Sequence, residues 1–190
     1  MFKLSLKGAV AIAVLTGASA GAYAQTVTDL GEVSTSVPTT FTGTVLGNQE
    51  SFMDIFTFTL AEPNISSGYN VINFPVDIPE AGTLGTIFSS MALLSYGNDG
   101  VRGTADDQVL TSIDSNSPDF DQGNLSLSWD GSLSGGHYLT IGGVTSGSLG
   151  GLYSGSVAAA VPEPETYAML LAGLGLMAGV VRRRSMRKTS

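Results

Sequence analysis

The sequence predicts an all-β domain of the sandwich or jelly-roll type. Short runs rich in Val, Ile, Thr, Phe and Tyr are separated by clusters of Gly, Asn, Asp and Ser, which is typical of strands joined by turns. Between residues 25 and 160, no segment keeps an apolar period of 3.6 residues over three turns, so helices are not expected there. Eight short strands at this spacing favour two packed sheets over alternating βαβ units.

Residues 1–24 precede this domain and have the pattern of a secretory signal peptide. Lys3 and Lys7 supply the positive start, an apolar run follows from Ala9 to Leu15, and small residues end the segment. Cleavage after Ala24 fits the small-x-small rule, and cleavage after Ala20 is the alternative. We therefore expect export, and we exclude this segment from the folded domain.

The domain, residues 25–160, is long enough to bury one hydrophobic core. The glycine-rich stretch 142–151 is expected to be a mobile surface loop, because glycine favours turns over regular strands. The expected strands are Thr39–Leu46, Ser51–Leu60, Tyr69–Phe74, Ser90–Tyr96, Val109–Ile113, Leu125–Trp129, His137–Ile141 and Tyr153–Ala158.

The charge of this domain is strongly negative. It holds 14 of the 16 acidic residues of the chain and only one of the eight basic residues, Arg102, which gives a net charge of −13. Nucleic acid is excluded as a partner, because phosphate binding requires clustered Lys or Arg. The chain has no cysteine, so we expect the exported domain to depend on its core, or on a metal, rather than on disulfides.

One acidic residue lies among apolar ones in the expected strand Ser51–Leu60. Alternate residues of a strand share a face, so Asp54 falls on the same side as Phe52 and Phe56, which should be the core. A buried carboxylate costs several kcal/mol unless it is satisfied. Asp54 is therefore expected to accept backbone hydrogen bonds, pair with Arg102, bind a cation, or turn outward at a bulge.

The loop from Gly97 to Gln108 is the second acidic feature. Asn98, Asp99, Asp106 and Asp107 offer oxygen atoms around flexible glycines, and calcium prefers six to eight such ligands. The spacing does not match an EF-hand, and Asn, Asp and Gly also suit an ordinary hairpin loop. Calcium is the one cofactor that the sequence suggests, with these four residues and Asp54 as candidate ligands.

No catalytic constellation is visible, and the sequence predicts a protein that is not an enzyme. His137 is the only histidine, so a site with paired histidines for a transition metal is excluded. The only G-x-S-x-G match is Gly17–Gly21, which lies in the signal peptide and cannot be a nucleophile elbow.

The C-terminal residues, 161–190, combine a proline-rich start, an apolar run and a basic end. The run from Thr166 to Val181 has no charge and would give about 24 Å of helix, which is shorter than a hydrocarbon core of ~30 Å. Arginine snorkelling and local bilayer thinning can make up the difference. We expect a single transmembrane helix at 166–181, with the cluster Arg182, Arg183 and Arg184 on the cytoplasmic side.

The order Pro162-Glu163-Pro164, apolar run and arginine cluster resembles the PEP-CTERM sorting signal of Gram-negative bacteria. The resemblance implies recognition by exosortase, a membrane-embedded processing enzyme, with Pro162, Glu163 and Pro164 as the recognised motif. It also implies an association with exopolysaccharide and biofilm. The run Phe52-Met53-Asp54-Ile55-Phe56 is similar to the FxDxF subgroup of these proteins, for which no biochemical activity is implied.

The sequence therefore predicts an exported surface or matrix protein that is held at the inner membrane before processing. Its acidic domain would be a structural component associated with exopolysaccharide. The alternative is a calcium- or carbohydrate-binding module at the cell surface. In that case Tyr96, Trp129 or Tyr153 could stack on sugars, although Trp129 also suits the core.

Overall fold

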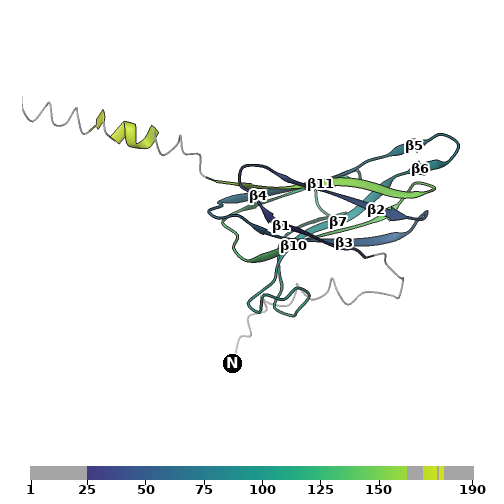
Figure 1. Cartoon of the computed structure of the whole chain (residues 1–190), viewed down its shortest axis with the longest axis horizontal. Helices are drawn as coiled ribbons and strands as arrows, with labels where there is room; N and C mark the ends of the chain where they lie inside the picture. Colours follow the sequence, from purple (N-terminus) through teal and green to yellow (C-terminus); the bar gives the residue numbers. More distant parts are fainter. Residues whose placement is uncertain (1–24, 162–168, 175, 178–190) are drawn as a thin grey trace, which may run out of the picture. The chain divides into compact units, whose positions relative to one another are not determined.

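The computed structural model describes residues 25–161, 169–174 and 176–177. The chain divides into two compact units, residues 1–160 and 161–190, and each is described here by itself. The described residues of the first unit, 25–160, contain eleven strands arranged in two sheets (Figure 1). The all-β sandwich predicted from the sequence is confirmed.

The first sheet, sheet A, has five strands. The N-terminal strand pairs in parallel with its neighbour, and all other pairs in this sheet are antiparallel. In spatial order the strands are β1 (Val27–Val33), β3 (Ser51–Leu60), β10 (Gly136–Thr145), β7 (Thr86–Ser95) and β8 (Gln108–Asp114).

The second sheet, sheet B, has six strands and is organised around the last strand of the domain. That strand, β11 (Gly150–Ala160), pairs antiparallel with β2 (Thr39–Leu46) on one side and with β4 (Ser66–Asn73) on the other. The sheet is completed by the antiparallel pair β5 (Val76–Ile78) and β6 (Gly82–Leu84), and by β9 (Asn124–Asp130).

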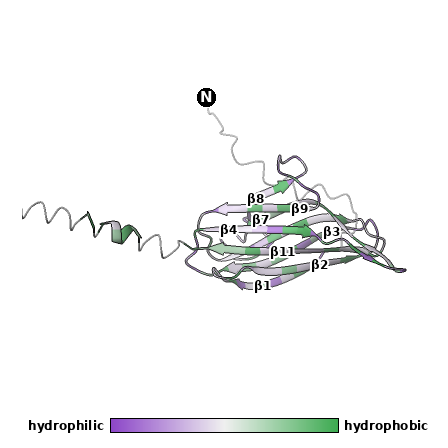
Figure 2. Ribbon diagram, turned by 90° about the horizontal axis from the view of Figure 1, so that it is seen from above, coloured by the Kyte–Doolittle hydropathy of each residue, from purple (hydrophilic) through white to green (hydrophobic). Residues whose placement is uncertain are grey.

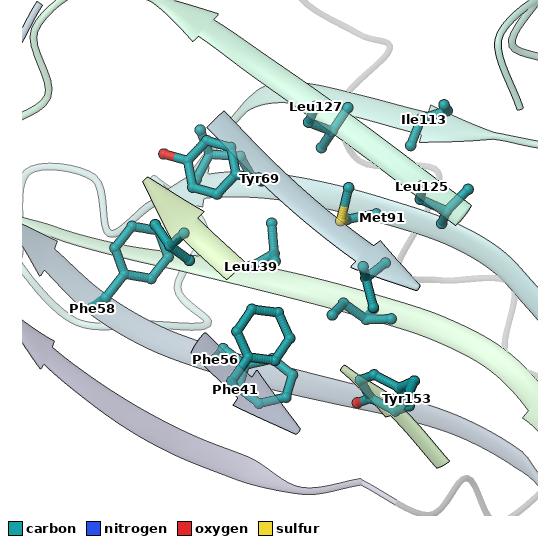
Figure 3. Packing of buried hydrophobic residues seen from close by; sticks show 14 of the residues in the cluster. Phe41, Phe56, Phe58, Tyr69, Met91, Ile113, Leu125, Leu127, Leu139 and Tyr153 are labelled. Atoms are coloured by element: carbon teal, nitrogen blue, oxygen red, sulfur yellow. The ribbon is translucent and has the colours of Figure 1, made fainter. Parts of the chain in front are cut away.

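The hydrophobic core lies between the two sheets and follows from the alternation of side chains along each strand. In β2, Phe41 and Val45 are buried while the threonines between them are exposed. The ring of Phe41 packs on that of Phe56 from β3, with ring centroids 4.1 Å apart (Figure 3). Tyr69 and Tyr153, which are large and almost fully buried, contribute from sheet B. Burial of these aromatic rings is expected to dominate the stability of the domain.

All eight expected strands are present, and two of them have the expected bounds, β2 and β3. The sequence did not indicate β1, which carries Asp29, Gly31 and Glu32, nor the three-residue strands β5 and β6. Polar residues and glycine weaken a strand pattern, and three residues are too few to show one.

The loop expected at residues 142–151 is shorter in the structure, where only residues 146–149 connect two strands. Residues 142–145 belong to β10, residues 150–151 belong to β11, and Gly142 and Gly143 are buried. A methyl group on Gly143 would lie 2.8 Å from the ring of Phe52, so this strand requires glycine for packing. Glycine in a strand marks a close approach of another group here, rather than a turn.

In the second unit, residues 169–174 and 176–177 are helical. Their large apolar side chains are all more than half exposed: Met169, Leu170, Leu171, Leu174, Leu176 and Met177. Within the described parts of the chain, no helix has the length and apolar character needed to cross a membrane. The remaining residues of the expected span 166–181 lie outside the described ones, as do the predicted signal peptide, Pro162–Pro164 and the arginine cluster.

Candidate functional site

The buried carboxylate of Asp54 is the centre of one polar cluster in the core. Asp54 lies on the inner face of β3, beside Phe52 and Phe56 as the strand pattern predicted, and is only 2% exposed. The backbone N–H of Thr26 donates to Asp54 Oδ1 at 3.1 Å, and the Thr26 hydroxyl donates to the same oxygen. The hydroxyl of Tyr153 donates to Asp54 Oδ2. Both carboxylate oxygens thus have partners, as a buried charge requires.

Tyr153 reaches Asp54 because its neighbours leave room for the ring. Tyr153 of β11 pairs with Gly43 of β2, and a methyl group on Gly43 would overlap the tyrosine ring. The rings of Phe52 and Phe88 pack on it, with centroids 5.6 Å and 5.7 Å away. Burial, together with the nearby Asp54 carboxylate, raises the pKa of Tyr153 well above its usual value. The phenol therefore stays a hydrogen-bond donor.

This cluster joins three parts of the chain: the N-terminal segment through Thr26, sheet A through Asp54 and sheet B through Tyr153. Of the alternatives expected for Asp54, the structure shows hydrogen bonds from donors of the chain itself, and β3 pairs with β10 without a bulge. Neither Thr26 nor Tyr153 was recognised from the sequence as a partner, and Tyr153 is fully buried rather than exposed for stacking on a sugar. The arrangement is that of a structural site.

The acidic loop forms a hydrogen-bond network of its own, away from the core. Asp106 Oδ2 accepts the backbone N–H of Asn98 at 2.7 Å and that of Asp99 at 3.2 Å. The Thr104 hydroxyl lies 2.7 Å from Asp106 Oδ1, and this bond, followed by the backbone bonds, lowers the pKa of Asp106. The loop carboxylates therefore order the loop by accepting its own donors.

Asp107 attaches this loop to the outer face of sheet A. Its Oδ2 accepts hydrogen bonds from the Tyr138 hydroxyl and from the Gly103 backbone N–H, both at 2.7 Å. Tyr138 is 6% exposed and belongs to a small apolar cluster with Ile55 and Leu94. Burial, then the bond to Asp107, raises the pKa of Tyr138. The loop is thus held to sheet A by a hydrogen bond with a buried tyrosine.

The five candidate calcium ligands do not form one site. Asn98, Asp99, Asp106 and Asp107 share the loop, whereas Asp54 is enclosed in the core with Thr26 and Tyr153. Among the residues that the structure describes, no group of three or more His, Cys, Asp or Glu side chains is arranged to hold a metal ion. Calcium binding by the loop stays a prediction.

His137 and Trp129 both contribute to the interior. His137 is 2% exposed, its Nδ1 lies 3.0 Å from the Gly135 carbonyl oxygen, and its ring stacks on Phe58. Burial lowers the pKa of His137, which favours the neutral ring. Trp129 packs against the main core cluster.

A shallow surface pocket of about 440 Å³ lies at one end of sheet A and was missed by sequence reasoning. Its polar lining comes from Gln122 and from Ser51, Ser89, Ser90 and Ser115. The register between β7 and β10 shifts between Gly142 and Gly143, beside two of these serines. This bulge lies beside the pocket, and no local pattern in the sequence predicted it.

Comparison with known proteins identifies the C-terminal segment. Residues 160–185 match the family model of the PEP-CTERM protein-sorting motif. This motif implies an exported, surface-targeted protein with exosortase as its processing partner. The predicted sorting motif Pro162, Glu163 and Pro164 and the cluster Arg182–Arg184 both fall within the matched residues. The resemblance to the FxDxF subgroup stays a prediction.

No curated protein matches the sequence. Among solved structures, the pre-peptidase C-terminal domain of a collagenase from Bacillus anthracis is similar over 72% of this chain and 99% of its own, with 15% identity and a TM-score of 0.40. CorA, a surface-associated copper-binding protein of Methylomicrobium album BG8, is similar over 73% of this chain and 100% of its own, with 8% identity and a TM-score of 0.38. Neither likeness assigns a site or a ligand to this chain.

Proposed function

We propose that the protein is a structural component of the cell surface or extracellular matrix, associated with exopolysaccharide and biofilm, which exosortase sorts and releases. The match of residues 160–185 to the PEP-CTERM protein-sorting motif carries this proposal. In this scheme the signal peptide directs export, and the segment 166–181 holds the protein at the inner membrane until the tail is processed.

The arrangement of the domain supports this order of events. Thr26, two residues after the proposed cleavage at Ala24, already donates hydrogen bonds to buried Asp54. At the other end, β11 ends at Ala160, and the motif match begins at that residue. The folded domain therefore fills the sequence between the two proposed processing sites.

Anchoring by the tail is supported by its helical, exposed apolar residues at 169–174 and 176–177. Exposed leucine and methionine side chains on a helix lose contact with water when they enter lipid, which is favourable. The cluster Arg182–Arg184 would then stop transfer at the cytoplasmic surface.

Fractionation of cells with and without the sorting enzyme tests the proposal. We expect the wild-type protein to leave the membrane fraction, with a reduced mass, only where the enzyme is present. A variant with Pro162→Ala and Pro164→Ala should stay in the membrane fraction at full tail length in both strains. Glu165→Gln, just outside the tripeptide, is the matched control and should be processed. Equal size and location of the wild-type protein in both strains would refute processing.

A further inference from the structure

The outer face of sheet B carries a regular set of small polar side chains. In β2, β4, β9 and β11 the buried residues alternate with outward ones, and the outward ones are mostly hydroxyl or amide residues. Figure 2 views this side of the domain, with these four strands side by side. We call this surface the hydroxyl face; it consists of Thr40, Thr42, Thr44, Asn70, Asn124, Ser126, Ser128, Ser154 and Ser156.

The strand register aligns these side chains in rows that cross the sheet. One row is formed by Thr40, Ser156, Asn70 and Ser126, and the next by Thr42, Ser154, Ile72 and Asn124. Neighbouring strands are about 4.8 Å apart, and successive outward residues of one strand are about 6.7 Å apart. The result is a grid of hydroxyl and amide groups, interrupted by the outward apolar side chains of Leu46, Ile72 and Leu152.

Most of these hydroxyl groups are free to bind a partner. Within the described residues, the side chains of Thr40, Thr42 and Thr44 have no hydrogen bond to the chain, and the same is true of Ser126, Ser128 and Ser156. Ser154 bonds the Phe41 carbonyl oxygen at 3.2 Å, and Asn70 bonds Asn124 at 2.9 Å. The face therefore offers many donors and acceptors that no group of the described chain satisfies.

The hydroxyl face is also uncharged, in a domain with a net charge of −13. None of its nine residues is ionisable, and the carboxylate of Asp130 lies at the end of β9, two residues beyond Ser128. A polyanion approaching the domain meets a repulsive field with only Arg102 to oppose it. Charge thus selects against anionic polymers, whereas a neutral polymer approaches without this cost.

An exposed ring lies at one end of the face. Phe74 is 53% exposed, and its backbone N–H donates to the Leu152 carbonyl oxygen of β11 at 3.0 Å. The electron-rich face of an aromatic ring attracts polarised C–H groups, such as those on the flat side of a sugar ring. A ring beside rows of hydroxyl groups provides both kinds of contact that a saccharide chain can make.

We propose that the hydroxyl face, with Phe74, binds a neutral polysaccharide that lies across the strands of sheet B. The proposal rests on the proposed function, since it names the surface and the charge class of the exopolysaccharide that the domain contacts. Hydrogen bonds from successive sugar hydroxyls to successive rows provide the affinity, and each contact is weak on its own. Binding is therefore multivalent along the polymer.

Affinity electrophoresis of the mature protein, recovered from the surface fraction of cells, tests the proposal. The neutral probes are dextran, hydroxyethyl cellulose and galactomannan, and the anionic probe is alginate. We expect retardation by at least one neutral probe and none by alginate. Thr40→Ala/Thr42→Ala/Thr44→Ala should weaken binding about tenfold or more, because three hydrogen bonds are lost together. Phe74→Ala should weaken it as well.

A matched triple variant on sheet A, Thr28→Ala/Thr59→Ala/Thr111→Ala, controls for the loss of threonine from strands and should bind like the wild type. If the wild type binds neutral probes and the β2 variant binds equally well, this inference fails while the proposed function stands. If no neutral probe retards the wild type, this inference fails, and if alginate does not retard it either, the association with polysaccharide fails as well. If the fractionation experiment shows that the wild-type protein is processed only where the sorting enzyme is present, the sorting part of the proposed function stands in either case.

Discussion

The Tyr153 hydroxyl donates a hydrogen bond to the Asp54 carboxylate, and this buried contact joins sheet B to sheet A. Replacing Tyr153 with Phe keeps the ring but leaves one oxygen of Asp54 without its donor. Because a buried acceptor without a partner costs its desolvation, we expect the free energy of unfolding to fall by about 1–3 kcal/mol. Urea denaturation followed by fluorescence measures this change.

The control for this variant is Tyr96→Phe, which removes a phenol hydroxyl from a half-buried ring on the outer face of sheet A. We expect it to change the free energy of unfolding by less than about 0.5 kcal/mol. Equal destabilisation by both substitutions would contradict the role assigned to the contact between Tyr153 and Asp54.

Thr26 is expected to stabilise the domain through the same carboxylate. Thr26→Val removes the hydroxyl donor and keeps the backbone N–H that bonds Asp54 at 3.1 Å, so we expect a loss of about 1 kcal/mol. Because Thr26 and Tyr153 share Asp54, the double variant should not show the sum of the single effects. A double-mutant cycle with an interaction energy near zero would show that the two contacts are independent.

Acid should destabilise the domain below about pH 6.5, where an unfolded histidine gains its proton. Burial lowers the pKa of His137 in the folded state, so the unfolded chain binds more protons and stability falls as the pH falls. His137 is the only histidine, so His137→Leu should flatten the dependence between pH 7.5 and 5.5. Urea midpoints at the two pH values provide the measurement, and parallel curves for both proteins would argue against the assignment.

The acidic loop should loosen when its bond to Tyr138 is removed. Asp107→Ala deletes the acceptor of two bonds at 2.7 Å, so we expect faster amide exchange at residues 97–107 with little change elsewhere. Asp114→Ala, at the end of β8, is the control, because it removes a carboxylate outside this loop.

The predicted binding of calcium by the loop is checked by calorimetry of the wild type and of Asp106→Asn with millimolar calcium. Heat that Asp106→Asn abolishes would support calcium binding, and no heat from the wild type would contradict it.

Much of the fold could be predicted because the strand signal is local. The alternation Phe41, Gly43, Val45 in β2 and the apolar face of β3 specify which side of each strand is buried. The same reasoning placed Asp54 in the core. The strand pattern could not identify Tyr153 as the partner of Asp54, because that contact joins residues 99 positions apart and depends on how the two sheets are stacked.

The features that the sequence did not predict involve residues whose role depends on their neighbours in space. Gly142 and Gly143 read as a loop, yet they lie in β10 because Ser90 and Phe52 occupy the space a side chain would need. Strand β1 lacks a clear pattern because it is an edge strand that pairs in parallel with β3 only. The hydroxyl face likewise emerges only when the register aligns four strands that are distant in sequence.

The sorting signal continues directly from β11, the strand that β2 and β4 flank in sheet B. Tension applied through the tail at Val161 would act along this strand. To extract it, the load must shear two antiparallel ladders together, whereas an edge strand would peel away one bond at a time. A protein held by the tail before processing would therefore resist mechanical unfolding when its other surfaces are pulled.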